Sequence, residues 1–264
     1  MGKAPALRLF GLVVGAFAGV YGLAVLALFG FQRPILYPLA LSDPFLDLAG
    51  AERVQVEVPD GTVPMDLSGP AGAPRVAFFH GNAEQIGQTR GDAALAEAQG
   101  LAFAAIEYPG YGDAHAGTPN EEAILGAARA ALAVLAGKGE PPPVCVGHSL
   151  GSGVAVAMAA EGRCRKLVAI SAYTSVVDLA SAYYPWLPAR WLVLDRYDSL
   201  GRAPSVTVPT LVVHGRLDPL IPSAMGEALA VALPQARFVV VDRGHNDIRD
   251  RELWATIGRF IAEP

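Results

Sequence analysis

The chain has 264 residues, of which 52% are hydrophobic and only 17% are charged. Because disordered chains combine low hydrophobicity with high net charge, this composition excludes intrinsic disorder, and the length suits one large domain. The formal net charge of −5 argues against a nucleic-acid partner, since phosphate binding needs clustered Lys and Arg. The two cysteines, Cys145 and Cys164, are too few for a disulfide framework and lack C-x-x-C spacing, so they leave the redox compartment open.

The first segment is a run of 23 uncharged, mostly apolar residues from Leu9 to Phe31. As a helix it would be roughly 35 Å long, enough to cross a hydrocarbon core of about 30 Å. Residues 9–31 are therefore predicted to be an uncleaved transmembrane anchor that follows a short cytoplasmic segment, residues 1–8. The alternative is a cleavable signal peptide with its cleavage site at Val25-Leu26-Ala27, but the apolar run continues past that site.

The charges that flank this span predict its orientation. Lys3 and Arg8 precede it, and only Arg33 follows it closely. The excess of positive charge on the cytoplasmic side of membrane spans then places the amino terminus in the cytoplasm. The rest of the chain is predicted to lie outside, in the periplasm or another extracytoplasmic space.

Three glycines lie on one face of the predicted span, at four-residue spacing. Small residues at this spacing let two helices approach closely, so the stripe suggests a homodimer formed through the membrane. A chain rich in Gly and Ala also scatters glycines by chance, which is the simpler interpretation. The three residues are Gly11, Gly15 and Gly19.

Residues 32–50, which contain three prolines, are predicted to be a linker. Residues 51–264 are predicted to form one α/β domain. Alternation of polar and apolar residues around Asp60-Gly61 predicts an antiparallel hairpin over 53–68. Further strands are predicted at 76–79, 101–106, 143–146, 166–170, 210–214 and 237–241, and helices at 85–99, 120–136, 150–160, 223–233 and 251–261. Fully apolar strands that alternate with helices indicate a parallel sheet covered on both faces. The predicted fold is a doubly wound, mostly parallel α/β sheet.

A G-x-S-x-G sequence, Gly147-His148-Ser149-Leu150-Gly151, lies between a predicted strand and an Ala-rich helix. In that context the turn is so tight that only glycines fit beside it, and it pushes the serine Oγ out at the top of the sheet. Ser149 is therefore predicted to be a nucleophile. The structural alternative is a glycine-rich turn in which the serine only caps the helix.

A serine nucleophile needs a base to take its proton, and the base needs an acid to orient it. Asp218 and His245 both follow the carboxyl ends of predicted parallel strands, where catalytic groups collect in open α/β sheets. They are predicted to complete a triad with Ser149. Asp242 is the main alternative acid, while His214 lies inside a strand and is expected to hydrogen-bond locally.

Two backbone amides are predicted to stabilise the oxyanion. One is the amide of Leu150, which follows the nucleophile at a helix N-terminus, and the other is Asn82, with Ala83 as the fallback, in the loop after the strand 76–79. No H-E-x-x-H, cysteine pair or P-loop occurs in the sequence, so no metal and no cofactor are predicted.

Five motifs occur in the order of a known family. They are His80-Gly81-Asn82-Ala83, Tyr108-Pro109-Gly110-Tyr111-Gly112, the G-x-S-x-G sequence, His214-Gly215-Arg216-Leu217-Asp218 and Gly244-His245-Asn246-Asp247. Over roughly residues 31–261 the chain resembles the membrane-anchored α/β-hydrolases of the Bem46 and ABHD12/13/17 type and their bacterial relatives. The resemblance implies the α/β-hydrolase fold, the same triad, and action on acyl thioesters or lipid esters. Ala172-Tyr173 departs from the serine-proline-phenylalanine run that is frequent in this group, which leaves the substrate pocket undefined.

The irregular segment 172–205 is predicted to form a short cap, whose aromatic residues either line an acyl pocket or pack against the sheet. The leading function is a membrane-anchored serine hydrolase that cleaves esters or thioesters of small-molecule or lipid acyl substrates through an acyl-enzyme. One alternative is a catalytically silent membrane scaffold on the same fold, because fold alone does not determine function. The other is a serine peptidase.

Overall fold

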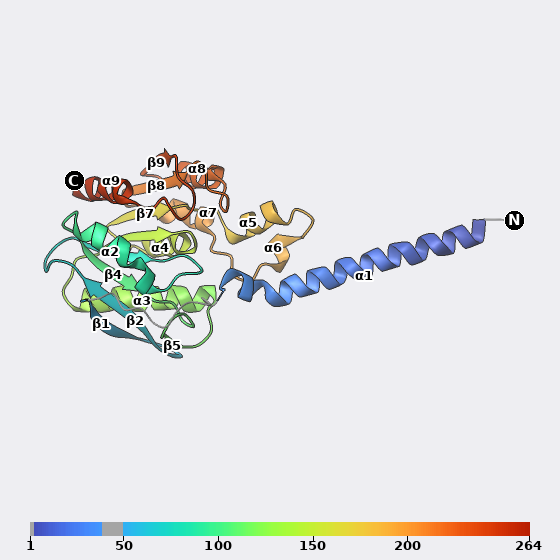
Figure 1. Cartoon of the computed structure of the whole chain (residues 1–264), viewed down its shortest axis with the longest axis horizontal. Coiled ribbons are helices and arrows are strands. Elements are labelled where there is room, and N and C mark those ends of the chain that lie inside the picture. The colour runs from blue at the N-terminus through green and yellow to red at the C-terminus, as the bar shows by residue number, and fades with distance from the viewer. Residues whose placement is uncertain (1–2, 39–49) are drawn as a thin grey trace.

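The computed structural model describes residues 3–38 and 50–264, so residues 1–2 of the predicted cytoplasmic segment and residues 39–49 of the predicted linker lie outside the described residues. A single long helix, α1 (Lys3–Leu36), projects from an α/β domain (Figure 1). Its part from Arg8 to Leu36 is long and apolar enough to cross a membrane.

The predicted linker begins too early, because α1 continues through Gln32 to Leu36. Pro34 lies within the last turn, which is closed by a 2.7 Å hydrogen bond from the Tyr37 amide to the Arg33 carbonyl. Proline usually ends a helix, but this turn is also held by side-chain contacts with the cap segment, described below. Tertiary contact therefore overrides the local signal.

The glycines of the predicted dimer stripe lie in the exposed part of α1. A methyl group added at Gly11, Gly15 or Gly19 would meet no described atom within 4 Å. Their contact with a second copy remains a prediction.

The domain is built on one twisted sheet. The described residues form nine strands: β1 (Glu52–Val58), β2 (Gly61–Ser68), β3 (Arg75–Phe79), β4 (Ala102–Ile106), β5 (His115–Ala116), β6 (Val144–His148), β7 (Lys166–Ile170), β8 (Thr210–Gly215) and β9 (Ala236–Val241). The order is β1-β2-β4-β3-β6-β7-β8-β9, with the two-residue β5 beside β2. The β1–β2 hairpin is antiparallel, and β2 pairs with β4 antiparallel. The strands β4, β3, β6, β7, β8 and β9 run parallel to one another. This confirms the predicted fold class.

Helices cover both faces of the sheet, which explains why the central strands are largely apolar on both sides (Figure 1). In β7, Leu167 and Ala169 join one core while Val168 and Ile170 join the other. The covering helices are α2 (Arg90–Glu97) and α9 (Arg251–Ala262) on one face, and α3 (Glu121–Gly137), α4 (Leu150–Ala160) and α8 (Ser223–Ala232) on the other. The predicted helix at 85–99 is divided, because a 3₁₀ turn, Ile86–Thr89, precedes α2.

The cap segment, residues 172–205, is helical where irregular structure was predicted. It contains α5 (Val176–Tyr183), α6 (Ala189–Leu192) and α7 (Ser199–Arg202), followed by a 3₁₀ turn at Ala203–Ser205. These helices are too short for a 3.6-residue period to show in the sequence. The start of α5 did have a local signal, since the Ser175 Oγ caps it by accepting from the Asp178 amide at 2.9 Å.

Cys145 on β6 and Cys164 in the loop between α4 and β7 form a disulfide, with their Cα atoms 5.7 Å apart. Cys145 lies on β6, two strand positions before Gly147, and both sulfurs belong to buried residues. A single cross-link of this kind was not predicted. It braces the strand that carries the nucleophile motif against the end of α4.

Candidate active site

Ser149 lies at a sharp turn between β6 and α4, as the motif predicts. Its backbone has φ 53° and ψ −121°, a conformation that L-residues rarely adopt. The flanking glycines are required: a Cβ on Gly147 would lie 2.1 Å from the Gly151 carbonyl oxygen, and one on Gly151 would lie 2.0 Å from the Phe79 carbonyl oxygen. The strained turn therefore presents the Ser149 hydroxyl beyond the carboxyl edge of the sheet.

The structure brings Ser149, His245 and Asp218 together in one line of hydrogen bonds. The His245 Nε2 lies 2.9 Å from the Ser149 Oγ, and its Nδ1 lies 2.7 Å from the Asp218 Oδ2. A carboxylate only accepts, so Nδ1 carries the proton and Nε2 has a free lone pair. That lone pair can accept the serine proton, which is the arrangement of a nucleophile with its general base.

Asp218 is held as a carboxylate by its surroundings. Its Oδ1 accepts from the Leu220 and Ile221 amides at 2.8 and 2.9 Å, and His214 lies 3.5 Å from its Oδ2. Burial opposes ionisation, but the hydrogen bonds from His214, His245 and the Ile221 amide outweigh it and hold the pKa of Asp218 well below its usual range. The predicted local bond of His214 is confirmed, since its Nε2 donates to the Ile221 carbonyl at 2.9 Å.

The alternative acid, Asp242, does not reach the site. Its side chain is 77% exposed and pairs with Arg216 at 2.8 Å. It lies on the surface at the end of β9, whereas Asp218 lies within the turn after β8. The geometry therefore selects Asp218 as the partner of His245.

His148 supports the loop that carries His245, a contact that the sequence did not reveal. Its ring lies 5.0 Å from the His245 ring, and its Nε2 donates to the His245 carbonyl oxygen at 2.9 Å. Burial and the charges of Arg249 and His245 lower the pKa of His148, against the opposing effect of Glu84. His148 is therefore neutral, with its proton fixed on Nε2 because a carbonyl oxygen can only accept.

Glu84 connects this support to the predicted oxyanion loop. Its Oε2 accepts from the Gly81 amide at 2.8 Å and lies 3.8 Å from the His148 Nδ1, while its Oε1 pairs with Arg249. Burial opposes its ionisation, but the neighbouring Arg249 guanidinium helps to hold the pKa of Glu84 far below its usual value. One carboxylate thus ties the loop after β3 to Arg249, beside the His148 ring.

A buried ion pair lies directly behind the same loop. The His80 Nε2 is 2.8 Å from the Glu107 Oε1, and its Nδ1 is 2.8 Å from the Gly81 carbonyl oxygen. Burial alone would lower the pKa of His80, but the hydrogen bond and charge of Glu107 outweigh it, so the pKa lies above its ordinary value. Both ring nitrogens face acceptors, so both are protonated.

The two predicted oxyanion donors flank Ser149. Leu150 begins α4, and a Cβ on Gly81, next to Asn82, would lie 3.7 Å from the Ser149 Cβ. Within the described residues the backbone amides of Asn82 and Leu150 donate to no protein acceptor. The Asn82 carbonyl accepts from the Tyr111 hydroxyl at 2.7 Å, which orients the peptide. Their role as donors to an anionic oxygen bound to Ser149 stays a prediction.

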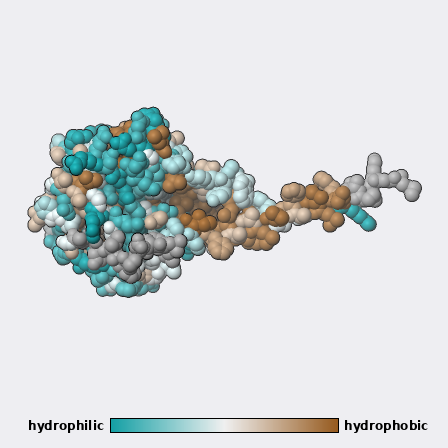
Figure 2. Space-filling view, viewed as in Figure 1, coloured by the Kyte–Doolittle hydropathy of each residue, from teal (hydrophilic) through white to brown (hydrophobic). Residues whose placement is uncertain are grey.

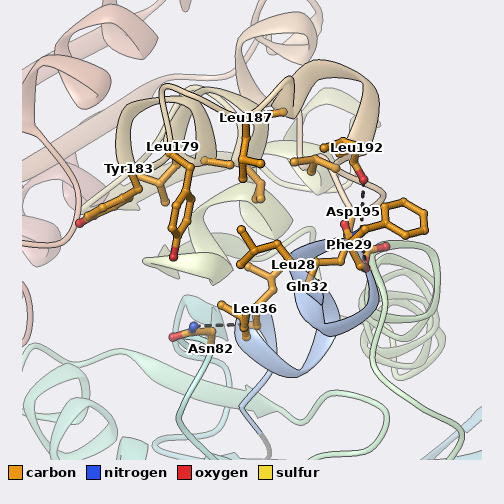
Figure 3. Close-up of a pocket in the computed structure, with 16 residues that line it drawn as sticks. Leu28, Phe29, Gln32, Leu36, Asn82, Leu179, Tyr183, Leu187, Leu192 and Asp195 are labelled. Atoms are coloured by element: carbon orange, nitrogen blue, oxygen red, sulfur yellow. Dashed lines mark hydrogen bonds between the residues drawn. The ribbon is translucent and has the colours of Figure 1, made fainter. Parts of the chain in front are cut away.

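An apolar cavity of about 320 Å³ runs between α1 and the cap (Figure 3). Asn82 of the predicted oxyanion loop lines it, whereas Ser149, Asp218 and His245 do not. Figure 3 shows Leu28 and Leu36 of α1 facing Leu179 and Leu187 of the cap across this space. Of the cap aromatics, Tyr183 and Tyr184 line the cavity. Their role in binding an acyl group stays a prediction. Among the described residues, no group of three or more His, Cys, Asp or Glu is placed to hold a metal ion.

The fold and this site define an α/β hydrolase, and comparison with known proteins agrees. The model of the family described as alpha/beta hydrolase fold matches residues 74–205. An uncharacterized protein of Mycobacterium tuberculosis, Rv2307c, is 34% identical over 269 aligned residues, which cover 95% of this chain and 94% of that protein. The chain belongs to the α/β-hydrolase family.

Two further relatives are more distant. Alpha/beta hydrolase domain-containing protein 17C of Mus musculus is 30% identical over 184 residues, covering 67% of this chain and 55% of that protein. The structure of the esterase Pf2001 of Pyrococcus furiosus superposes with a TM-score of 0.70 at 14% identity, covering 83% of this chain and 97% of the esterase. At that identity the likeness shows the fold alone.

Proposed function

We propose that this protein is a membrane-anchored serine hydrolase that cleaves carboxylic esters or thioesters of hydrophobic acyl substrates. The observation that carries the proposal is the line of hydrogen bonds from Ser149 through His245 to Asp218, with distances of 2.9 and 2.7 Å. A scaffold would not need a buried carboxylate aligned with a histidine and a strained serine. The apolar cavity that Asn82 lines favours an acyl group over a peptide.

The proposed reaction has two halves. The Ser149 Oγ attacks the acyl carbonyl carbon while His245 Nε2 takes the hydroxyl proton, and the amides of Asn82 and Leu150 hold the resulting oxyanion. Collapse breaks the bond to the alcohol or thiol, which leaves with the proton from His245. Water then gives one proton to His245 and attacks the acyl-serine. The bond between the acyl carbon and the Ser149 Oγ breaks, the Oγ takes the proton back from His245, and the carboxylic acid is released. Asp218 stabilises the imidazolium throughout.

The membrane anchor is the second part of the proposal. It is supported by the length and composition of α1, and by the Tyr21 hydroxyl, which donates to the Trp186 carbonyl at 3.1 Å. Cleavage at the possible signal-peptide site would remove that contact. The similarity to alpha/beta hydrolase domain-containing protein 17C also supports the predicted membership of the membrane-anchored group, of which we propose this chain is a member.

We further propose that the hydrolase domain lies outside the cytoplasm. The excess of basic residues before the span supports this orientation. So does the disulfide between Cys145 and Cys164, because such bonds persist in oxidising, extracytoplasmic compartments. The intact mass of the protein extracted from membranes, measured without reductant, should be two hydrogens below that of the dithiol chain. Two free thiols in that sample would contradict this orientation.

A fluorophosphonate probe tests the catalytic proposal directly. The full chain, extracted in a mild detergent, should gain one covalent adduct, and peptide mapping should place it on Ser149. The S149A variant is the matched control and should gain none. Wild-type protein that folds but remains unlabelled would support the catalytically silent scaffold instead.

A further inference from the structure

The cap is fastened to the end of α1 by polar contacts. The Gln32 amide nitrogen donates to the Leu192 carbonyl at 3.2 Å, and the Gln32 Oε1 accepts from the Leu194 amide at 2.9 Å. The Arg33 guanidinium pairs with Asp195 at 2.9 Å. The end of α1 is thus an integral part of the hydrolase domain and not a loose tether.

These contacts leave the cavity with little polar surface for a ligand. Gln32 and Asp195 line it, but their polar atoms are engaged in fastening α1 to the cap. The Asn82 side chain likewise donates to the Leu36 carbonyl at 3.1 Å, as Figure 3 shows. What remains for an occupant is mostly apolar surface, with Asn82 of the predicted oxyanion loop among the lining residues. That pattern fits an acyl chain whose carbonyl lies at Ser149.

The cavity lies where α1 leaves the hydrocarbon core. At about 1.5 Å per residue, a core of about 30 Å takes roughly 20 residues, so a span that starts after Arg8 ends near Leu28. Leu28 is the first residue of α1 that lines the cavity. The tip of the cap reaches further along α1, because the Trp186 ring packs edge-on against Tyr21 at 5.9 Å, and Tyr21 lies roughly 10 Å before Leu28 at about 1.5 Å per residue.

The surface of the cap is suited to the membrane interface. Trp191 is 76% exposed, and Trp186, Tyr183 and Leu194 are also exposed beside α1. Aromatic side chains concentrate at the boundary between hydrocarbon and water. Figure 2 shows the apolar surface of α1 continuing onto the adjoining part of the domain, around a hollow. A lipid chain can therefore pass from the bilayer to the cavity without crossing water.

We infer that α1 is one wall of the acyl-binding cavity, and that the substrate is a membrane lipid ester whose chain packs between α1 and the cap. This inference rests on the proposed function and adds the substrate class. The cavity volume limits the length of the acyl chain. If a methylene group takes about 30 Å³, as a water molecule does in the liquid, 320 Å³ holds roughly ten methylene groups. Chains of medium length should fit best.

The test replaces Leu28 of α1, which lines the cavity, with a larger and with a smaller side chain. The full chain in lipid nanodiscs is assayed on p-nitrophenyl esters from acetate to palmitate. L28W should lower kcat/KM on decanoate about tenfold or more while acetate changes less than about twofold, and L28A should move the optimum to longer chains. Opposite shifts cannot arise from misfolding. L26W and L26A are matched controls, because Leu26 is 67% exposed and does not line the cavity.

The inference is overturned if the Leu28 variants behave like the Leu26 variants, or if acetate and decanoate turnover fall together. A second measurement does not need turnover. In the S149A chain, decanoic acid with a photoreactive terminal carbon should cross-link to residues 28–36 and 176–193. Cross-links elsewhere only would also overturn the inference. Cross-links at these sites without fluorophosphonate labelling of wild-type Ser149 would instead refute the proposed hydrolase and leave the acyl cavity standing.

Discussion

At the residue scale, the proton positions on His245 and Asp218 determine whether His245 can act as a base. His245 can act as a base only if its proton stays on Nδ1, and the Asp218 carboxylate at 2.7 Å keeps it there. The His214 ring and two backbone amides hold that carboxylate ionised. The acid, the base and their supports are thus one electrostatic unit.

The tautomer can be tested at Asp218. An amide in place of the carboxylate can donate to Nδ1 and favours the wrong tautomer, so D218N should lower kcat by about 10⁴-fold. Hydrolysis of a short ester by the purified full chain measures this effect. D242N is the matched control, because Asp242 is exposed, and its kcat should change less than about twofold. A large loss in D242N with a small one in D218N would assign the acid to Asp242.

The buried His80–Glu107 pair makes a prediction about pH. The pKa of His80 is raised in the folded protein, so protonation stabilises the fold fully below the unfolded pKa of about 6.5. That contribution is lost as pH rises through the folded value. E107Q keeps a hydrogen-bond acceptor but removes the charge, so it should be less stable than wild type at pH 6. The difference in melting temperature between wild type and E107Q should decrease toward pH 9 in thermal unfolding curves. A difference that increases with pH would contradict the ion pair.

At the scale of elements, three separate parts of the chain meet at one carboxylate. Asp195 of the cap accepts from Arg33 of α1 and from the Glu121 amide at the start of α3. The Glu121 side chain in turn accepts from the Arg196 and Tyr197 amides of the cap. The cap is therefore positioned by polar contacts at its base, while its apolar side lines the cavity.

Removal of Arg33 should loosen this junction. Asp195 is buried, and R33A leaves its carboxylate with one charged partner fewer. Because the Arg33 side chain is 47% exposed, solvent screens the pair, and the cost should be about 1–2 kcal/mol. The matched control is K138A, which breaks the exposed pair with Glu52 and should leave the free energy of unfolding nearly unchanged. Equal losses of unfolding free energy in the two variants, measured in denaturant titrations, would show that the junction adds nothing.

At the scale of the whole molecule, α1 is a long rod that projects from the hydrolase domain (Figure 1), and its end lines the apolar cavity together with the cap. An anchor that only tethered the enzyme could be removed without changing its specificity. An anchor that forms a wall could not. The length of α1 therefore matters for both location and selectivity.

A chain that begins at Phe31 separates these two roles. It keeps the sheet, the candidate triad and Arg33, but it loses Leu28 and Phe29 from the cavity. It should stay in the supernatant after centrifugation and hydrolyse acetate esters, yet lose about tenfold or more on decanoate esters in bilayers. The full chain should sediment with membranes and resist carbonate extraction. An intact mass that starts near Leu28 would show instead that the apolar run is a cleaved signal peptide.

The sequence alone was sufficient for the features that depend on neighbours along the chain. Alternation of polar and apolar residues identified the hairpin, and short continuous apolar runs that alternate with helical stretches identified the buried parallel strands. The G-x-S-x-G turn identified Ser149, because its glycines are needed where a Cβ on Gly147 would lie 2.1 Å from a backbone oxygen. Asp218 and His245 could be chosen because the carboxyl ends of parallel strands meet at one edge.

Only the tertiary structure decided the rest, because it depends on residues far apart in the sequence. Glu107, 27 positions after His80, raises the pKa of His80. His148 hydrogen-bonds the carbonyl oxygen of His245, 97 positions later. The short cap helices carry too few turns for a period to show, and α1 passes Pro34 because Gln32 and Arg33 meet the cap about 160 residues later. The same long-range contacts turn an apolar segment, which the sequence marks only as a span, into a wall of the cavity.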